Sequence, residues 1–165
     1  MMIFLHYLWY VIKHKWYVFL ACRKFKITWL GIVHDWSKFR LSEFVPYAKH
    51  FYGKIETGRD ETGYYQAGET GDVLFDRAWF CHQSRNKHHW QYWIMPRDAT
   101  LGAKDDMFVL DMPVKYVLEM VADWIGAGKA QGKPDTQAWY DKNGERLILS
   151  ERTRSRVRLL LTLYA

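Results

Sequence analysis

Hydrophobic residues dominate the first 22 positions of the chain in two runs. The runs cover residues 1–12 and 16–22, and Lys13-His14-Lys15 separates them. Each is shorter than the roughly 20 apolar residues that a membrane span needs. The first run has no basic residue ahead of it and no small-residue cleavage site after it, unlike a signal peptide. We therefore expect one long, mostly buried helix over residues 3–26, with peripheral membrane contact as the lesser alternative.

The rest of the pattern is also mostly helical. Asp72 is a good N-cap, and Asp111-Met112-Pro113 is typical of a helix start. Gly126 or Gly128 is expected to end the helix that follows. The expected helices cover residues 28–33 (running into His34-Asp35), 43–52, 73–85, 113 to the two glycines, and 151 onward.

Two stretches lack helical periodicity. Residues 53–71 contain five glycines, which predicts a long loop that serves as a lid, and residues 132–144 are also expected to be loop. Short aromatic or β-branched runs over 90–94 and 108–110 predict a small hairpin. The sequence thus predicts an all-α helical bundle, a single domain over residues 1–165, with one long Gly-rich loop and a small β-hairpin.

The composition fits a globular chain with one core. Of its 165 residues, 49% are hydrophobic and 25% charged, which excludes a disordered or fibrous protein. Trp, Tyr and Phe make up 18%, enough to fill a large core and to line a pocket. Cys22 and Cys81 are too few for a disulfide scaffold, so we expect a reducing, cytoplasmic setting.

Charge is spread unevenly over a chain whose net charge is +6. Residues 1–52 carry 8 Lys and Arg against 2 acids, residues 53–128 carry 8 against 12, and residues 129–165 carry 8 against 4. The basic ends either attract a phosphorylated ligand toward central carboxylates or are simply solvated. Four alternating arginines, Arg152 to Arg158, could contact nucleic acid. Alternating residues scatter around a helix, however, so a solvated face is the favoured interpretation.

Histidines and aspartates recur in a pattern that points to metal binding. His34-Asp35 follows an apolar segment, and on a helix the two side chains would project about 100° apart toward one ion. Nitrogen and oxygen donors favour Mn, Fe, Co, Ni or Zn over Mg or Ca. The other candidate ligands come from separate helical segments: His14, His82, His88, His89 and Asp123.

The same residues also have simpler interpretations. His14 lies between two lysines and could be solvated, and the later histidines could be surface residues near a helix end. Asp123 falls beside the apolar stripe of its helix, where an unpaired carboxylate is costly, so it needs a metal or a cationic partner. We interpret Glu119, one turn earlier on the same face, as solvated.

The order His, His-Asp, His, His, Asp resembles the HD superfamily of metal-dependent phosphohydrolases. The most specific match is the block Gly31 to Lys38, GIVHDWSK. The chain also looks like a small family associated with phages and bacteria, in which the strings HDxSKF and HHWQYW recur, and a phage origin would place it in the host cytoplasm. The extra histidines look like the branch of this superfamily that binds two metal ions. Two features depart from that branch: the gap from His82 to His88-His89 is short, and a downstream Gly-Tyr-Pro string is missing. The resemblance therefore does not imply a cyclic dinucleotide substrate.

The resemblance implies a role for each residue of the pattern. Asp35, as a bridge between ions, and Lys38, as a contact to phosphate, would be the catalytic residues. Arg85 and Lys87 would be further substrate contacts. One or two divalent ions would be held, the first by His14, His34, Asp35 and Asp123, the second by His82 with His88 or His89.

The function implied is that of an enzyme, a phosphohydrolase that cleaves a nucleotide or another small phosphoester with a metal-activated water. It would act as a phosphomonoesterase, phosphodiesterase or nucleotidase. One alternative is a non-haem di-iron oxygenase of the HD type, although Lys38 has no clear oxidative task. The other is a non-catalytic binding or counter-defence protein on the same scaffold. The expected partner is a small phosphorylated substrate, and the sequence leaves the oligomeric state open.

Overall fold

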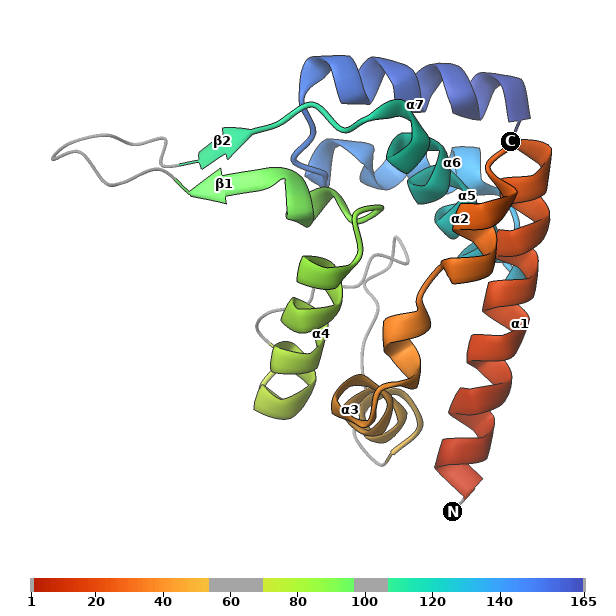
Figure 1. The fold of residues 1–165 in the computed structure, drawn as a ribbon, viewed down its shortest axis with the longest axis vertical. Helices are drawn as coiled ribbons and strands as arrows, with labels where there is room; N and C mark the ends of the chain where they lie inside the picture. Colours follow the sequence, from red (N-terminus) through yellow and green to blue (C-terminus); the bar gives the residue numbers. More distant parts are fainter. Residues whose placement is uncertain (1, 54–69, 97–106, 165) are drawn as a thin grey trace, which may run out of the picture.

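The computed structural model describes residues 2–53, 70–96 and 107–164. The long helix α1 forms one side of the molecule, and α4 lies on the other side (Figure 1). The α-helices are α1 (Met2–Lys24), α2 (Thr28–Val33), α3 (Leu41–Tyr52), α4 (Val73–Arg85), α5 (Val114–Ala130), α6 (Thr136–Asn143) and α7 (Glu151–Tyr164). The other described elements are the 3-10 helices η1 (Trp36–Phe39), η2 (Trp90–Trp93) and η3 (Gly144–Arg146) and the strands β1 (Ile94–Pro96) and β2 (Met107–Val109).

The all-α fold class expected from the sequence is confirmed. The hairpin also forms, with Ile94 opposite Val109 in an antiparallel pair, but residues 90–93 belong to η2 instead of the first strand. No helix in the described ranges combines the length and the apolar character that crossing a membrane requires. The predicted lid over 53–71 lies, apart from its ends, outside the described residues.

Two predictions on the C-terminal side were wrong. α5 continues through both glycines that were expected to end it and stops at Ala130, because its tertiary packing outweighs the low helix propensity of glycine. The predicted loop over 132–144 contains α6. The Asp135 side chain caps that helix by accepting a hydrogen bond from the backbone N–H of Ala138 at 2.8 Å.

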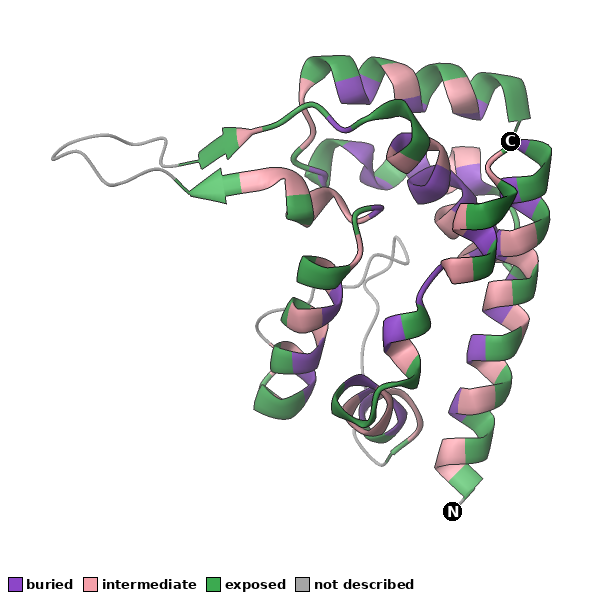
Figure 2. Ribbon diagram, viewed as in Figure 1, coloured by how far each residue is buried: buried purple, intermediate pink, exposed green. Residues whose placement is uncertain are grey.

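Two apolar clusters fill the interior, one against each half of α1 (Figure 2). The first half of α1 packs against α3, which packs in turn on α4, and Tyr7, Tyr47 and Phe75 are in the cluster there. The second half packs against α5, which packs in turn on α7, and Val18 and Val121 are fully buried there. The buried face of α1 also carries a histidine between these two clusters, and the polar centre described below is built around it.

A close approach of two helices fixes the position of that centre. A Cβ atom on Gly126 of α5 would lie 2.4 Å from Cγ2 and 2.8 Å from the backbone nitrogen of Val18 on α1. No real Cβ contact is that short, so only glycine permits this crossing. It brings the preceding turns of α5, which carry Glu119 and Asp123, against the buried face of α1.

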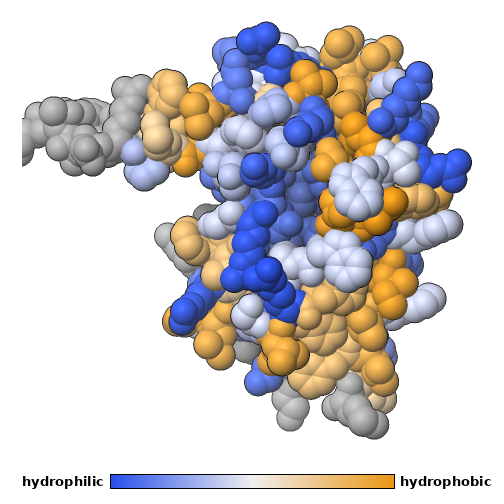
Figure 3. Space-filling model, in the orientation of Figure 1, coloured by the Kyte–Doolittle hydropathy of each residue, from blue (hydrophilic) through white to orange (hydrophobic). Residues whose placement is uncertain are grey.

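Hydrophobic side chains also remain on the surface. In Figure 3, hydrophobic and pale aromatic side chains gather on the side formed by α1 and α2. The exposed residues there include Trp9, Trp16 and Trp29. Single exposed apolar residues are normal, whereas large contiguous apolar patches are uncommon on monomeric proteins.

Candidate metal centre

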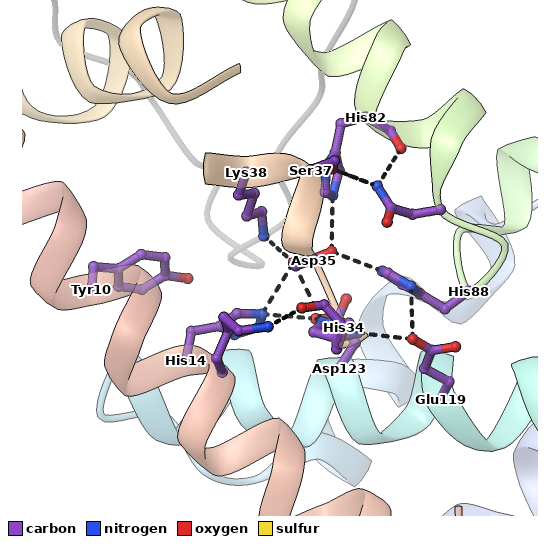
Figure 4. A network of polar contacts seen from close by, with 12 residues as sticks. Tyr10, His14, His34, Asp35, Ser37, Lys38, His82, His88, Glu119 and Asp123 are labelled. Carbon is purple, nitrogen blue, oxygen red and sulfur yellow. Dashed lines mark hydrogen bonds and ion pairs between the residues drawn. The ribbon is translucent and has the colours of Figure 1, made fainter. Parts of the chain in front are cut away.

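Residues from widely separated parts of the chain meet between α1, α4 and α5 (Figure 4). α1 contributes His14, the segment after α2 contributes His34 and Asp35, and α5 contributes Asp123. His82 lies on the last turns of α4, and His88 and His89 follow that helix. The structure therefore brings together every residue that the sequence pattern marked as a candidate ligand.

Asp35 occupies a turn, where the sequence had placed it on a helix. α2 ends at Val33, and Asp35 adopts a left-handed conformation with φ 53° and ψ 27°. Aspartate tolerates this region better than most residues. Lys15 Nζ donates a hydrogen bond to the His34 carbonyl oxygen, and the backbone N–H of Lys38 donates to the Asp35 carbonyl oxygen at 3.0 Å. The turn directs the His34 and Asp35 side chains into the bundle, where both are 1% exposed.

The first group of donors surrounds one oxygen of Asp35. Asp35 Oδ2 lies 3.5 Å from His14 Nε2 and 3.3 Å from His34 Nε2. Asp123 Oδ1 lies 3.1 Å from His14 Nε2 and 3.2 Å from His34 Nε2. Two imidazole nitrogens and two carboxylate oxygens thus converge, with all four within 4.8 Å of one another.

The second group surrounds the other oxygen of Asp35. Asp35 Oδ1 lies 3.3 Å from His82 Nε2 and 3.4 Å from His88 Nε2. His89 completes a group of four residues whose ligand atoms lie within 4.8 Å of one another. His88 and His89 are both in this group, so the structure keeps both of them as candidate ligands.

The donor atoms fit divalent transition metal ions. Buried polar side chains almost always have hydrogen-bond partners. Within the described residues, Asp35 Oδ1 and the Nε2 atoms of His14, His82, His88 and His89 are buried without a well-formed hydrogen bond, and Asp35 Oδ2 is met by the Lys38 ammonium group. Mixed nitrogen and oxygen donor sets of this kind suit Mn, Fe, Co, Ni or Zn. Because Asp35 offers one oxygen to each group, the donor sets could hold two ions with this carboxylate between them.

Glu119 supports the histidines from outside the two groups. Its Oε1 lies 3.1 Å from His34 Nδ1 and 3.3 Å from His88 Nδ1. Each Nδ1–H can donate to this carboxylate, which turns the Nε2 lone pair of that ring toward the donor groups. Glu119 is 5% exposed, so its interpretation as solvated was wrong. The imidazoles of His34 and His88, which follow α2 and α4, contact this carboxylate and cover its face of α5.

A second supporting carboxylate, Glu43 on α3, was missed in the sequence. Glu43 Oε2 lies 3.0 Å from His82 Nδ1 and accepts a 2.7 Å hydrogen bond from Ser37 Oγ. Its other oxygen accepts a hydrogen bond from Arg85. The available signal was helical spacing, because Glu43 shares a face with the buried Tyr47 one turn later. A carboxylate on an apolar face implies buried partners.

The three expected cationic contacts lie in different surroundings. Lys38 Nζ lies 2.5 Å from Asp35 Oδ2, at the centre itself. Arg85 is engaged with Glu43 and lines a cavity of about 480 Å³ together with Arg40. Lys87 Nζ lies 5.8 Å from the ring centroid of Tyr92. Of the three, Lys38 is the one that the structure places directly against the donor groups.

Burial and charge move the pKa values of the centre in opposite directions. Burial alone would raise the pKa of Asp35, but the positive charges of His34 and Lys38 outweigh it and hold this pKa well below the usual value. Burial alone would lower the pKa of His34, yet Asp35 and the other nearby carboxylates hold it well above. Burial and neighbouring histidines lower the pKa values of His88 and His89. A metal ion would therefore displace a proton from His34 and meet neutral imidazoles at His88 and His89.

The fold and the donor groups together define the class of this protein: an all-α bundle with a buried histidine–carboxylate centre suited to metal ions. A family model matches residues 4–163, and the chain belongs to that family, which is described as a family of unknown function (DUF5662). Searches of the curated proteins and of the solved structures give no match to this chain.

Proposed function

We propose that this chain is a divalent-metal-dependent phosphohydrolase of the HD type, acting on a small phosphoester. The observation that carries the proposal is the position of Asp35, whose two buried oxygens face separate groups of histidine and carboxylate donors. Two ions on either side of a shared carboxylate suit phosphoester hydrolysis, because they can stabilise both the attacking and the leaving oxygen. The order of the ligands along the chain and the GIVHDWSK block agree with the HD resemblance.

Bound ions would supply a water of lowered pKa and would offset the charge of the phosphate. The residues of the chain contribute binding and positioning. Lys38 stays protonated, because Asp35 raises its pKa although burial opposes this. Its side chain is 14% exposed, so a phosphate oxygen can reach the ammonium group. Asp123 is 16% exposed, and these two residues mark the side on which the centre meets solvent.

A cavity beside the centre supports a substrate with an aromatic part. It has a volume of about 440 Å³, and its lining includes Trp9, Tyr10, Lys13 and Tyr52. The ring of Tyr10 stacks on that of His14, with 6.0 Å between centroids, so the cavity adjoins the first donor group. Aromatic rings and a lysine suit the base and the phosphate of a nucleotide.

The test combines metal analysis with a substrate screen. Purified protein is analysed for Mn, Fe, Co, Ni and Zn, and phosphate release is then measured from nucleoside mono-, di- and triphosphates and from an aryl phosphodiester, with Mn or Co added. We expect Asp35→Asn to lose metal and turnover together. Asp141→Asn, an exposed aspartate on α6, is the matched control and should change neither.

Two results would reject the proposal. One is full turnover in the Asp35→Asn variant. The other is a metal-loaded protein that hydrolyses none of these substrates, which would leave the binding scaffold as the better interpretation. Oxygen consumption by the iron-loaded protein, without phosphate release, would favour the oxygenase instead.

A further inference from the structure

The side of α1 that faces away from the bundle is apolar over most of its length. At about 100° per residue, the exposed large apolar residues of α1 fall within an arc of roughly 80° around the helix. Figure 2 shows exposed residues along this side and buried residues on the inner side of the helix. Six residues, each between 39% and 72% exposed, make up what we call the α1 stripe: Met2, Leu5, Trp9, Ile12, Trp16 and Leu20.

Neighbouring elements extend this apolar surface. Trp29 and Ile32 on α2 and Trp36 on η1 are also exposed. α2 packs directly on α1, where a Cβ on Gly31 would lie only 2.7 Å from Cys22 Cβ. Hydrophobic and pale aromatic side chains gather over these elements in Figure 3. An apolar surface that runs along a whole helix and onto its neighbour is typical of a binding surface.

The exposed charges of the elements that form this surface, α1, α2 and η1, are all positive. The only acids among residues 2–53, Asp35 and Glu43, are both buried and paired with cations inside the protein. No carboxylate of this part of the chain therefore reaches the surface. α1 itself contains no acid and four cations, Lys13, Lys15, Arg23 and Lys24.

We infer that the α1 stripe docks the protein on an anionic lipid surface. A helix with an apolar face, tryptophans and flanking lysines lies in the plane of a membrane interface, with its apolar face sunk about 5–10 Å into it. Tryptophan prefers that level of the bilayer, and negatively charged headgroups attract the flanking cations. The stripe lies outside the metal centre and shares Trp9 with the lining of the aromatic cavity, but the inference does not depend on the proposed function.

Charge and side-chain type favour a lipid surface over two other binding partners, a second copy of the chain and nucleic acid. A second copy would bring the same cations, among them Lys13 and Lys15, against each other without a compensating acid. Nucleic acid would compensate the charge, but its interfaces are polar and offer nothing to Met2, Leu5 and Ile12. A lipid surface matches both the apolar stripe and the positive flanks.

The experiment is flotation of the full-length protein with vesicles. One set is phosphatidylcholine alone, and the other contains about equal parts of phosphatidylcholine and phosphatidylglycerol, a composition rich in anionic lipid. We expect binding to the anionic vesicles, little binding to the neutral ones, and release at about 0.5 M salt, because salt screens charge at the interface. Quenching of tryptophan fluorescence by brominated lipid should accompany binding.

A pair of variants locates the surface. Ile12→Ser with Trp16→Ser should weaken binding on the order of a hundredfold, because two interfacial apolar side chains are lost. Leu74→Ser with Phe80→Ser is the matched control on α4, where both residues are comparably exposed, and it should bind as the wild type does. Circular dichroism checks that each variant is folded.

Several results would overturn the inference: no vesicle binding by the wild type, equal binding to neutral and anionic vesicles, or equal loss in the α4 control. Light scattering tests the second copy directly. A wild-type dimer that the α1 variant converts to monomer would assign the stripe to self-association instead.

Discussion

Replacing the two supporting glutamates by glutamine should affect the two donor groups differently. Glu119 Oε1 contacts Nδ1 of His34 in the first group and of His88 in the second. Among the described histidines of the centre, Glu43 contacts His82 alone, through Nδ1, and therefore serves the second group. Glutamine keeps the shape and one acceptor oxygen of each side chain but removes the charge that orients and polarises the imidazole.

The expected magnitude follows from these contacts. Loss of a hydrogen-bonded carboxylate behind a metal-ligating histidine costs about 10–100-fold in metal affinity, which is about 1.4–2.7 kcal/mol. Glu119→Gln should lower the affinity for both ions by that factor, because Glu119 contacts both His34 and His88. Glu43→Gln should lower the affinity for the second ion and leave the affinity for the first nearly unchanged.

The assay is a competition titration of metal-free protein against a chelator, with the number of bound ions counted by native mass spectrometry. Glu145→Gln is a matched control, because Glu145 is 83% exposed and among the described contacts pairs with Arg154 and Arg158, away from the donor groups. Equal losses in the Glu43 and Glu119 variants would contradict the separate donor groups. Unchanged affinity in both would show that these carboxylates do not orient the ligands.

Three further predictions follow from the same geometry. Lys38→Met should raise KM for the phosphoester at least tenfold while the metal content stays constant. Steady-state kinetics and metal analysis of the same preparation check this. Loss of metal would mean that Lys38 supports the ligands instead. Because the pKa of His34 is raised in the folded state, its proton stabilises the metal-free fold, fully at pH values below the unfolded pKa of about 6.5, and this stability should be lost as pH rises through the folded pKa. Metal affinity should increase over the same pH range. If the free energies of urea unfolding of the metal-free and metal-loaded protein change with pH in parallel between about pH 6.5 and 9, the reasoning fails. Gly126→Ala should destabilise the protein by about 1–3 kcal/mol through its clash with Val18, and an unchanged melting temperature would contradict the close crossing.

Local patterns predicted most of the helices. The two apolar runs at the start of the chain predicted α1, and Asp72 accepts a hydrogen bond from the backbone N–H of Phe75 at 3.1 Å as an N-cap should. Both signals are local, because they depend on residues within a few turns of each other. The missed helix, α6, has little apolar periodicity, and the extension of α5 past Gly126 depends on contact with α1.

The sequence by itself determined the residue types that can bind metal and the helical segments that carry most of them. Tertiary structure decided how they meet: the turn at Asp35 turns its side chain inward, Gly126 lets α5 approach His14, and Glu43 and Glu119 lie behind the ligands. The physical reason is distance along the chain. Hydrophobic periodicity reports which side of one helix is buried, but it contains no information on which buried polar atoms of other helices lie opposite.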